Sequence, residues 1–141
     1  MEMNPYLSFK GDCETAFNFY VRCLGGKLGP IFRYGGTPLA DDVPADWSNK
    51  IMHGTLTLAD QVLMGADVAP DRYETPKGFS LLLQIKSTAD AEHIFDELAK
   101  DGRIVMPLEK TFWAERFGML VDRFSIPWLI NCEGSDQATE V

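Results

Sequence analysis

Hydrophobic and polar residues alternate along this chain with two different periodicities. Residues 50–59 alternate between apolar and polar positions, which predicts a β-strand with His53, Thr55 and Thr57 on its polar side. Residues 13–24 place apolar side chains three or four positions apart, which predicts an amphipathic helix. The same patterns predict a second helix between residues 88 and 100, and further strands at 5–9, 27–34, 62–68, 79–86, 103–110, 116–122 and 127–133.

Turn-forming residues separate these elements. Asp12 is expected to cap the first helix, and Ser87 or Thr88 the second, because short polar side chains accept hydrogen bonds from helix N–H groups. Asp122 is expected to fix the turn before the last strand. Residues 35–49 form a loop that is too long for a bare connection, so we expect it to cover part of the molecule.

The order strand, helix and three strands occurs twice. It spans residues 5–68 and again 78–133, as a repeat of element order rather than of letters. One helix covers only one face of a sheet, so the other face of each sheet must meet something else. We expect an α+β fold of two βαβββ modules in a single domain of residues 1–141, with residues 134–141 as a disordered acidic tail.

Charge and cysteine content narrow the function classes. Thirteen Lys and Arg against 21 Asp and Glu give a formal net charge of −8, which argues against nucleic-acid binding. No apolar run reaches the ~20 residues of a membrane span, and no signal peptide is visible. Cys13 and Cys23 would lie ~15 Å apart on one helix, too far for a disulfide. With Cys132 as the third, odd cysteine, we expect reduced thiols and a cytoplasmic protein.

An aromatic and charged cluster precedes the last two strands. Trp113 and Phe117 could stack on a planar substrate, or they could pack in the core or across a dimer contact. Arg116 could clamp a carboxylate or phosphonate with its planar fork. The alternative is a surface ion pair between Arg116 and Glu115 or Glu109, which contributes little stability.

The remaining candidates come from other strands. His53, one of two histidines, is the catalytic candidate as a general base or ligand, or else a hydrogen-bonded histidine in the sheet wall. Asp67 is a site carboxylate or a turn residue. Tyr6 and Asn131 could orient a ligand or form structural hydrogen bonds. The predicted ligand-binding residues are Tyr6, Ser8, Asp67, Ser80, Trp113, Arg116, Phe117 and Asn131.

Several phrases of the sequence resemble one protein family. They are Asn4-Pro5-Tyr6-Leu7-Ser8-Phe9, Ala16-Phe17-x-x-Tyr20-x-x-x-Leu24-Gly25, Thr111-Phe112-Trp113-Ala114-x-x-Phe117-Gly118 and Asp122-Arg123-Phe124-x-x-Pro127-Trp128-x-Ile130-Asn131. Together with the doubled element order, they resemble the vicinal oxygen chelate superfamily of glyoxalase I, extradiol dioxygenases and bleomycin-resistance proteins, in its PhnB-like, demethylubiquinone methyltransferase-like branch. The resemblance implies a cupped, incomplete, antiparallel-rich barrel in each module, an internal cavity and a homodimer.

The resemblance also implies positions for a divalent metal, held by His and Glu on the first and a later strand of each half. At those positions this chain has Tyr6, Ser8, Met64, Gly65, Asp67, Phe79, Ser80, Leu129 and Asn131. No histidine is among them, and a catalytic metal needs about three protein ligands. No strand leads through a glycine-rich turn into a helix, the usual nucleotide-binding device. We therefore predict a degenerate metal site and no cofactor.

Three functional hypotheses remain open from the sequence. The first is a protein that binds an unknown small molecule in a polar cavity. The second is a metal-assisted lyase, isomerase or dioxygenase-type enzyme that uses His53 and Asp67. The third is an interaction module without a small ligand.

Overall fold

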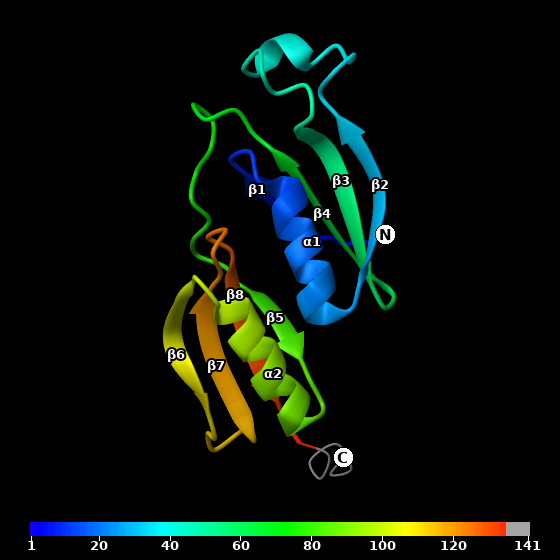
Figure 1. The fold of residues 1–141 in the computed structure, drawn as a ribbon. Coiled ribbons are helices and arrows are strands. Elements are labelled where there is room, and N and C mark those ends of the chain that lie inside the picture. Colours follow the sequence, from blue (N-terminus) through cyan, green and yellow to red (C-terminus); the bar gives the residue numbers. More distant parts are fainter. Residues whose placement is uncertain (135–141) are drawn as a thin grey trace. The chain divides into compact units, whose positions relative to one another are not determined.

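The computed structural model describes residues 1–134 and divides the chain into two compact units. The N-terminal unit comprises Met1–Glu74, and the C-terminal unit begins at Thr75. Each unit has the order strand, helix and three strands, so the predicted fold of two βαβββ modules is confirmed (Figure 1). The predicted acidic tail lies outside the described residues, apart from Gly134.

The N-terminal unit folds into one mixed sheet and one long helix. Its elements are β1 (Tyr6–Phe9), α1 (Cys13–Leu24), β2 (Lys27–Arg33), the short 3-10 helix η1 (Ala40–Asp42), β3 (Ile51–Leu58) and β4 (Gln61–Asp67). The strands lie in the order β1-β4-β3-β2. β1 runs parallel to β4, whereas β3 is antiparallel to both β4 and β2.

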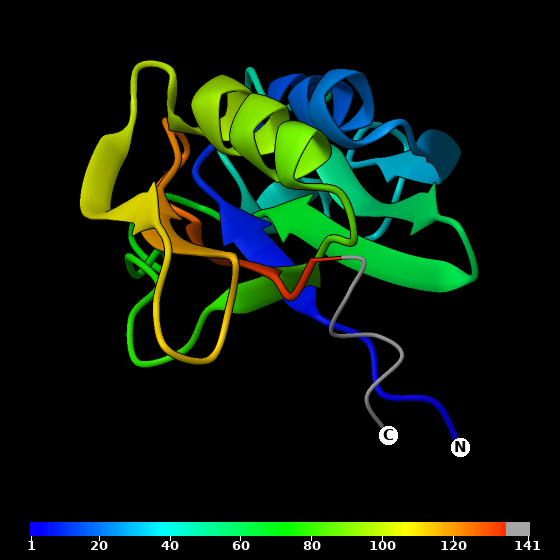
Figure 2. The same ribbon diagram turned by 90° about the horizontal axis from the view of Figure 1, so that it is seen from below.

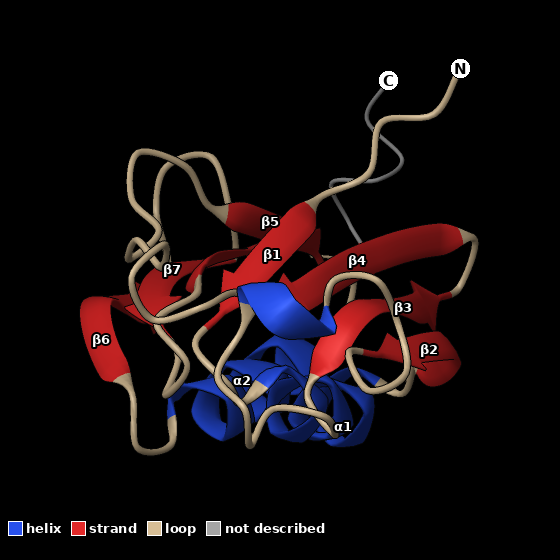
Figure 3. Ribbon diagram, turned by 90° about the horizontal axis from the view of Figure 1, so that it is seen from above, coloured by secondary structure: helices blue, strands red, loops and turns tan. Residues whose placement is uncertain are grey.

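The C-terminal unit repeats this arrangement. Its elements are β5 (Leu81–Gln84), α2 (Thr88–Ala99), β6 (Arg103–Glu109), β7 (Arg116–Val121) and β8 (Pro127–Cys132). The strand order is β5-β8-β7-β6, with β5 parallel to β8 and the other neighbours antiparallel. Figure 3 separates the helices from the strands by colour and shows each long helix on one face of its own sheet.

Each helix lies against the sheet of its unit (Figure 2), and the residues it buries there are mostly apolar. In the N-terminal unit the ring of Phe17 meets that of Phe9 edge-on, 5.9 Å between centroids. In the C-terminal unit Phe95, 3% exposed, lies against Gly118 of β7. Because strand side chains alternate between faces, every second residue points away from the helix. We call that side of each sheet its helix-free face.

The two helices begin differently. The hydroxyl of Ser87 accepts a hydrogen bond from Asp90 N at 3.2 Å, which confirms the predicted cap of α2. The prediction for α1 was wrong, because Asp12 makes no side-chain cap bond. Asp67, at the end of β4, accepts hydrogen bonds from Gly11 N at 3.0 Å and Cys13 N at 2.9 Å in its place. A strand residue distant in sequence therefore satisfies N–H groups at the start of α1.

The long loop after β2 covers one end of the N-terminal core. Trp47 is only 8% exposed, and its ring lies 6.4 Å from that of Tyr34. The Tyr34 hydroxyl donates a hydrogen bond to the backbone oxygen of Asp67 at 2.6 Å. The expectation that this loop covers part of the molecule is therefore confirmed.

Asp122 holds the turn before β8, as predicted. Its Oδ1 accepts hydrogen bonds from Phe124 N at 2.8 Å and Ile126 N at 3.0 Å. Its Oδ2 accepts one from Trp128 Nε1 at 2.9 Å, and Trp128 is 2% exposed in the core. Within residues 1–134, none of the helices combines the length and apolar character that a membrane crossing requires.

Candidate functional site

Tyr6 and His53 meet on the helix-free face of the N-terminal sheet. The Tyr6 hydroxyl lies 3.0 Å from Nδ1 of His53, and the rings stack with centroids 5.6 Å apart and planes at 26°. Burial raises the pKa of Tyr6, so the phenol keeps its proton. In the tautomer that carries the imidazole proton on Nε2, Nδ1 accepts a hydrogen bond from the Tyr6 hydroxyl and Nε2–H can be donated to a ligand.

A third ring extends this pair. Phe32 of β2 is the cross-strand partner of His53, and the two ring centroids are 6.4 Å apart with planes at 30°. Tyr6 is 51% exposed and Phe32 is 54% exposed. We call Tyr6, His53 and Phe32 the ring row. It places one imidazole between two accessible aromatic faces, an arrangement suited to a planar ligand.

Two smaller polar residues lie on the same face. Ser8 alternates with the buried Leu7 and Phe9 on β1, so it points away from α1 as Tyr6 does. The Thr55 hydroxyl donates to the backbone oxygen of Pro30 at 3.3 Å, across to β2. The structure thus brings together three predicted residues, Tyr6, Ser8 and His53. Phe32 is not among the residues predicted from the sequence, because register shifts along the β2–β3 ladder hide its pairing with His53.

Asp67 lies elsewhere, in the core of the N-terminal unit. It is 1% exposed, and besides Gly11 N and Cys13 N its carboxylate accepts a hydrogen bond from Ile51 N at 2.9 Å. Burial raises the pKa of this carboxyl, against the opposing effects of the three backbone N–H groups and Lys50. Asp67 and His53 point to opposite faces of the sheet, so the two cannot hold one metal ion.

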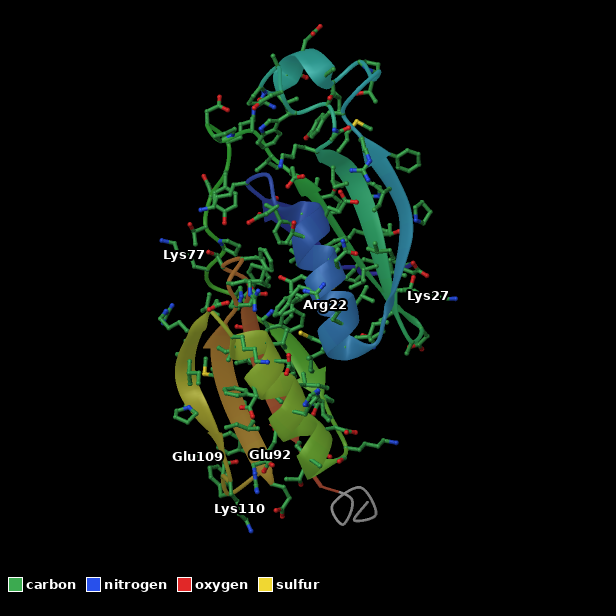
Figure 4. All side chains as sticks on the ribbon, in the orientation of Figure 1. Arg22, Lys27, Lys77, Glu92, Glu109 and Lys110 are labelled. Carbon is green, nitrogen blue, oxygen red and sulfur yellow. The ribbon has the colours of Figure 1, made fainter. Side chains whose placement is uncertain are left out.

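The predicted cluster in the C-terminal unit is divided between two faces. Arg116 points to the side of α2, where its Nε lies 3.2 Å from Oε1 of Glu92, and its Nη1 donates to the backbone oxygen of Glu115 at 2.6 Å. Figure 4 labels Glu92 on α2 and Glu109 at the end of β6. The ion-pair partner of Arg116 is therefore Glu92, instead of the predicted Glu115 or Glu109. Phe117, the next residue, points to the helix-free face.

The other predicted residues of this unit gather on the helix-free face. The rings of Trp113 and Phe117 meet at 66°, with centroids 5.2 Å apart. Asn131 is the cross-strand partner of Phe117, and its Nδ2 donates to Oε1 of Gln84 at 2.7 Å. Ser80 lies just before β5 and is half-buried. Gln84 is not among the predicted site residues, although its alternation with Leu81 and Leu83 indicates this face.

The positions that the fold associates with metal binding do not fit a metal here. Asp67 is the one carboxylate among them, and its oxygens are occupied by backbone N–H groups. The others supply hydroxyl, amide, thioether or apolar side chains. No group of three or more His, Cys, Asp or Glu in residues 1–134 is placed to hold a metal ion. On the helix-free face of the N-terminal sheet, the groups available for chemistry are therefore the imidazole of His53 and the neighbouring rings of Tyr6 and Phe32.

The doubled βαβββ order and the mixed sheets define the glyoxalase-type fold of the vicinal oxygen chelate class. The fosfomycin resistance protein FosX from Listeria monocytogenes has the same fold, with 10% identity, a TM-score of 0.65, and 97% of this chain and 96% of that one covered. The sequence profile described as 3-demethylubiquinone-9 3-methyltransferase matches residues 1–131. The chain belongs to this family, as its resemblance to the PhnB-like branch implied.

Three relatives span nearly the whole chain. Protein YjdN of Escherichia coli (strain K12) is 34% identical over 139 residues, which cover 93% of this chain and 95% of YjdN. The crystal structure of protein PA1353 from Pseudomonas aeruginosa is 43% identical with a TM-score of 0.86, and 96% and 99% of the two chains are covered. The PhnB protein from Bacillus cereus is 26% identical with a TM-score of 0.80, over 94% and 99% of the chains.

Proposed function

We propose that this protein binds a small planar molecule on the helix-free face of its N-terminal sheet, with His53 as the polar anchor. The observation that carries the proposal is the ring row, in which the Tyr6 hydroxyl lies 3.0 Å from His53 Nδ1. His53 uses Nδ1 alone among the described residues, which leaves Nε2 for a ligand.

The chemistry of the ring row selects the ligand class. Tyr6 and Phe32 offer exposed aromatic faces, and Nε2–H of His53 offers a donor between them. A flat aromatic ring with a carboxylate or phenolate substituent satisfies both features, since the ring stacks and the oxygen accepts the hydrogen bond. Aromatic carboxylates are therefore the class of ligand we expect.

A thermal-shift and titration series with benzoate, salicylate and 2-naphthoate tests this function. We expect at least one of them to raise the melting temperature of the wild-type protein. His53→Gln should weaken that binding at least tenfold, because glutamine lacks the imidazole ring that contacts Tyr6 and Phe32 and leaves its N–H donor without a fixed position. The matched control is His93→Gln on the exposed side of α2, which should leave the affinity unchanged.

Arg116→Ala serves as a second control, because Arg116 points to the α2 side of the other sheet. Its ion pair with Glu92 is partly exposed and contributes little to stability. Aromatic carboxylates that bound equally well to the wild type and to His53→Gln would contradict the proposal. Loss of binding in Arg116→Ala alone would do so too.

Methyl transfer, which the family description names, is not part of this function. A nucleoside-containing methyl donor is commonly held by a glycine-rich turn between a strand and a helix, where backbone N–H groups are available. The turn between β1 and α1 has Gly11 alone, and Asp67 occupies the N–H groups of Gly11 and Cys13. The residues of this turn therefore do not fit such a donor.

We also propose that the protein is a cytoplasmic homodimer. The support for the dimer is an apolar segment of the edge strand β6 that is suited to a protein contact: Ile104, Val105 and Met106 are 52%, 48% and 43% exposed. Sedimentation equilibrium should give twice the mass of one chain, and Val105→Glu should shift the population toward monomer. A wild-type protein that sediments as a monomer at all accessible concentrations would contradict this proposal.

A further inference from the structure

A second polar group lies on the helix-free face of the C-terminal sheet. Gln84 and Asn131 are cross-strand partners on the parallel strands β5 and β8, and Asn131 Nδ2 donates to Gln84 Oε1 at 2.7 Å. This bond orients both amides and leaves Gln84 Nε2 as a donor and Asn131 Oδ1 as an acceptor. Neither of these two atoms has a hydrogen-bond partner within residues 1–134; Gln84 is exposed, and Asn131 is 8% exposed.

The amide pair is not required by the fold, as the N-terminal unit shows. Gly54 and Gly118 occupy equivalent places, each opposite a phenylalanine of its helix. The strand pairings that start from these two glycines can be followed in both sheets. In the C-terminal sheet Gln84 then occupies the position that Ser8 has in the N-terminal sheet, and Asn131 the position of Ala66. The same sheet architecture thus forms with a hydroxyl and a methyl group at these positions. The fold itself therefore does not require two side-chain amides that are hydrogen-bonded to each other at these positions.

Aromatic and apolar side chains surround the amide pair. Phe117 is the partner of Asn131 on β7, and the Trp113 ring packs on Phe117. One row further along the same face, Leu129 pairs with Leu82 on one side and with Met119 on the other. Leu82 and Trp113 are 49% and 46% exposed. The face therefore combines a polar edge, an aromatic side and an apolar floor, the usual composition of a site for a flat organic molecule.

From this juxtaposition we propose a second ligand site at Gln84 and Asn131 that binds planar cyclic imides or lactams. Such a ring carries an adjacent C=O and N–H on one edge. The Gln84 amide donates to the ring carbonyl, and Asn131 Oδ1 accepts from the ring N–H. A paired donor and acceptor are selective because an analogue that lacks one of them leaves a protein group unpaired. This site consists of residues of the C-terminal unit alone, and its proposal stands without the proposed function.

Binding of lumichrome, a neutral tricyclic imide, tests the proposal by equilibrium dialysis with the full-length protein. Gln84→Glu replaces the donor with an acceptor at nearly constant size, and the affinity should fall at least tenfold. Methylation of the imide nitrogen of lumichrome should weaken its binding to the wild type by a similar factor. Gln61→Glu is the matched control, because it makes the same change at an exposed strand position of the other unit and should have no effect.

The variants also separate this site from the ring row. Lumichrome affinity that is unchanged in His53→Gln and reduced in Gln84→Glu supports the second site. Absence of binding to the wild type, equal binding to Gln84→Glu, or loss of binding in His53→Gln would each overturn it. Circular dichroism of Gln84→Glu verifies that the variant is folded. Aromatic carboxylates can still bind at His53 if lumichrome does not bind at all, so each proposal can fail alone.

Discussion

Asp67→Ala is expected to lower the free energy of unfolding by about 3–5 kcal/mol, the largest effect we foresee for a single substitution. The carboxylate of Asp67 accepts hydrogen bonds from Gly11 N, Cys13 N and Ile51 N. Alanine would leave these backbone donors without a partner in a place where the side chain is 1% exposed. Urea denaturation followed by tryptophan fluorescence measures the change, with Asp46→Ala in the exposed loop as the control expected within about 0.5 kcal/mol of wild type.

Asp67→Asn should fall between the wild type and Asp67→Ala, because one acceptor oxygen remains. The pH dependence gives an independent check. Burial raises the pKa of the folded-state Asp67 carboxyl above its ordinary value of 3.8, so the folded protein binds this proton more tightly than the unfolded chain. The stability difference between wild type and Asp67→Asn should therefore decrease as the pH rises from 3.8 through the raised pKa. An increase over that range would contradict our assignment.

Gly118→Ala is expected to lower the free energy of unfolding by about 1–3 kcal/mol. A β-carbon at this position would lie 2.7 Å from Cε2 of Phe95, and 3.0 Å from the Cα of Leu108 on β6. Phe95 is packed in the core of the C-terminal unit, and Leu108 is approached at its backbone, so neither can move aside without disturbing its neighbours.

The equivalent glycine of the N-terminal unit provides the control. A β-carbon at Gly54 would have side-chain atoms as its two nearest neighbours, Ile51 Cγ2 at 3.2 Å and Phe17 Cε2 at 3.6 Å, and the backbone oxygen of Gly65 only at 3.8 Å, an ordinary van der Waals distance. Gly54→Ala should therefore cost less than about 1 kcal/mol, since side chains adjust more easily than backbone. Equal losses for the two variants, measured in parallel by urea denaturation, would show that backbone proximity at Leu108 is not the limiting contact.

The pattern of apolar residues was sufficient to predict the fold. Alternation in residues 50–59 identified β3 and assigned His53 to the helix-free face, and helical spacing identified α1. The resemblance to the PhnB-like branch was visible in the sequence phrases and is shown by the family match over residues 1–131. These features depend on local periodicity and on short motifs, both of which are present in the letters themselves.

The candidate site was harder to predict from the sequence than the fold, because the register between strands decides which of its residues lie side by side. Phe32 reaches His53 only after register shifts in the β2–β3 ladder that no local pattern indicates. The sequence around Asp67 does not distinguish a residue that ends a strand from one that binds a ligand. Its three backbone hydrogen-bond donors come from two other segments of the chain, which no local pattern indicates. The separation of Arg116 from Phe117 was within reach, because neighbouring residues of a strand point to opposite faces.

The hydrogen bond between Asp67 and Cys13 joins residues 54 positions apart, and this spacing affects how the protein is made. While the chain is still emerging from the ribosome, α1 is synthesised long before the carboxylate that completes its first turn. Until β4 has left the exit tunnel and paired with β1, that helix must rely on its own weak propensity. We expect the nascent chain to acquire protease resistance in one late step, after β4 emerges, rather than gradually as each element is added.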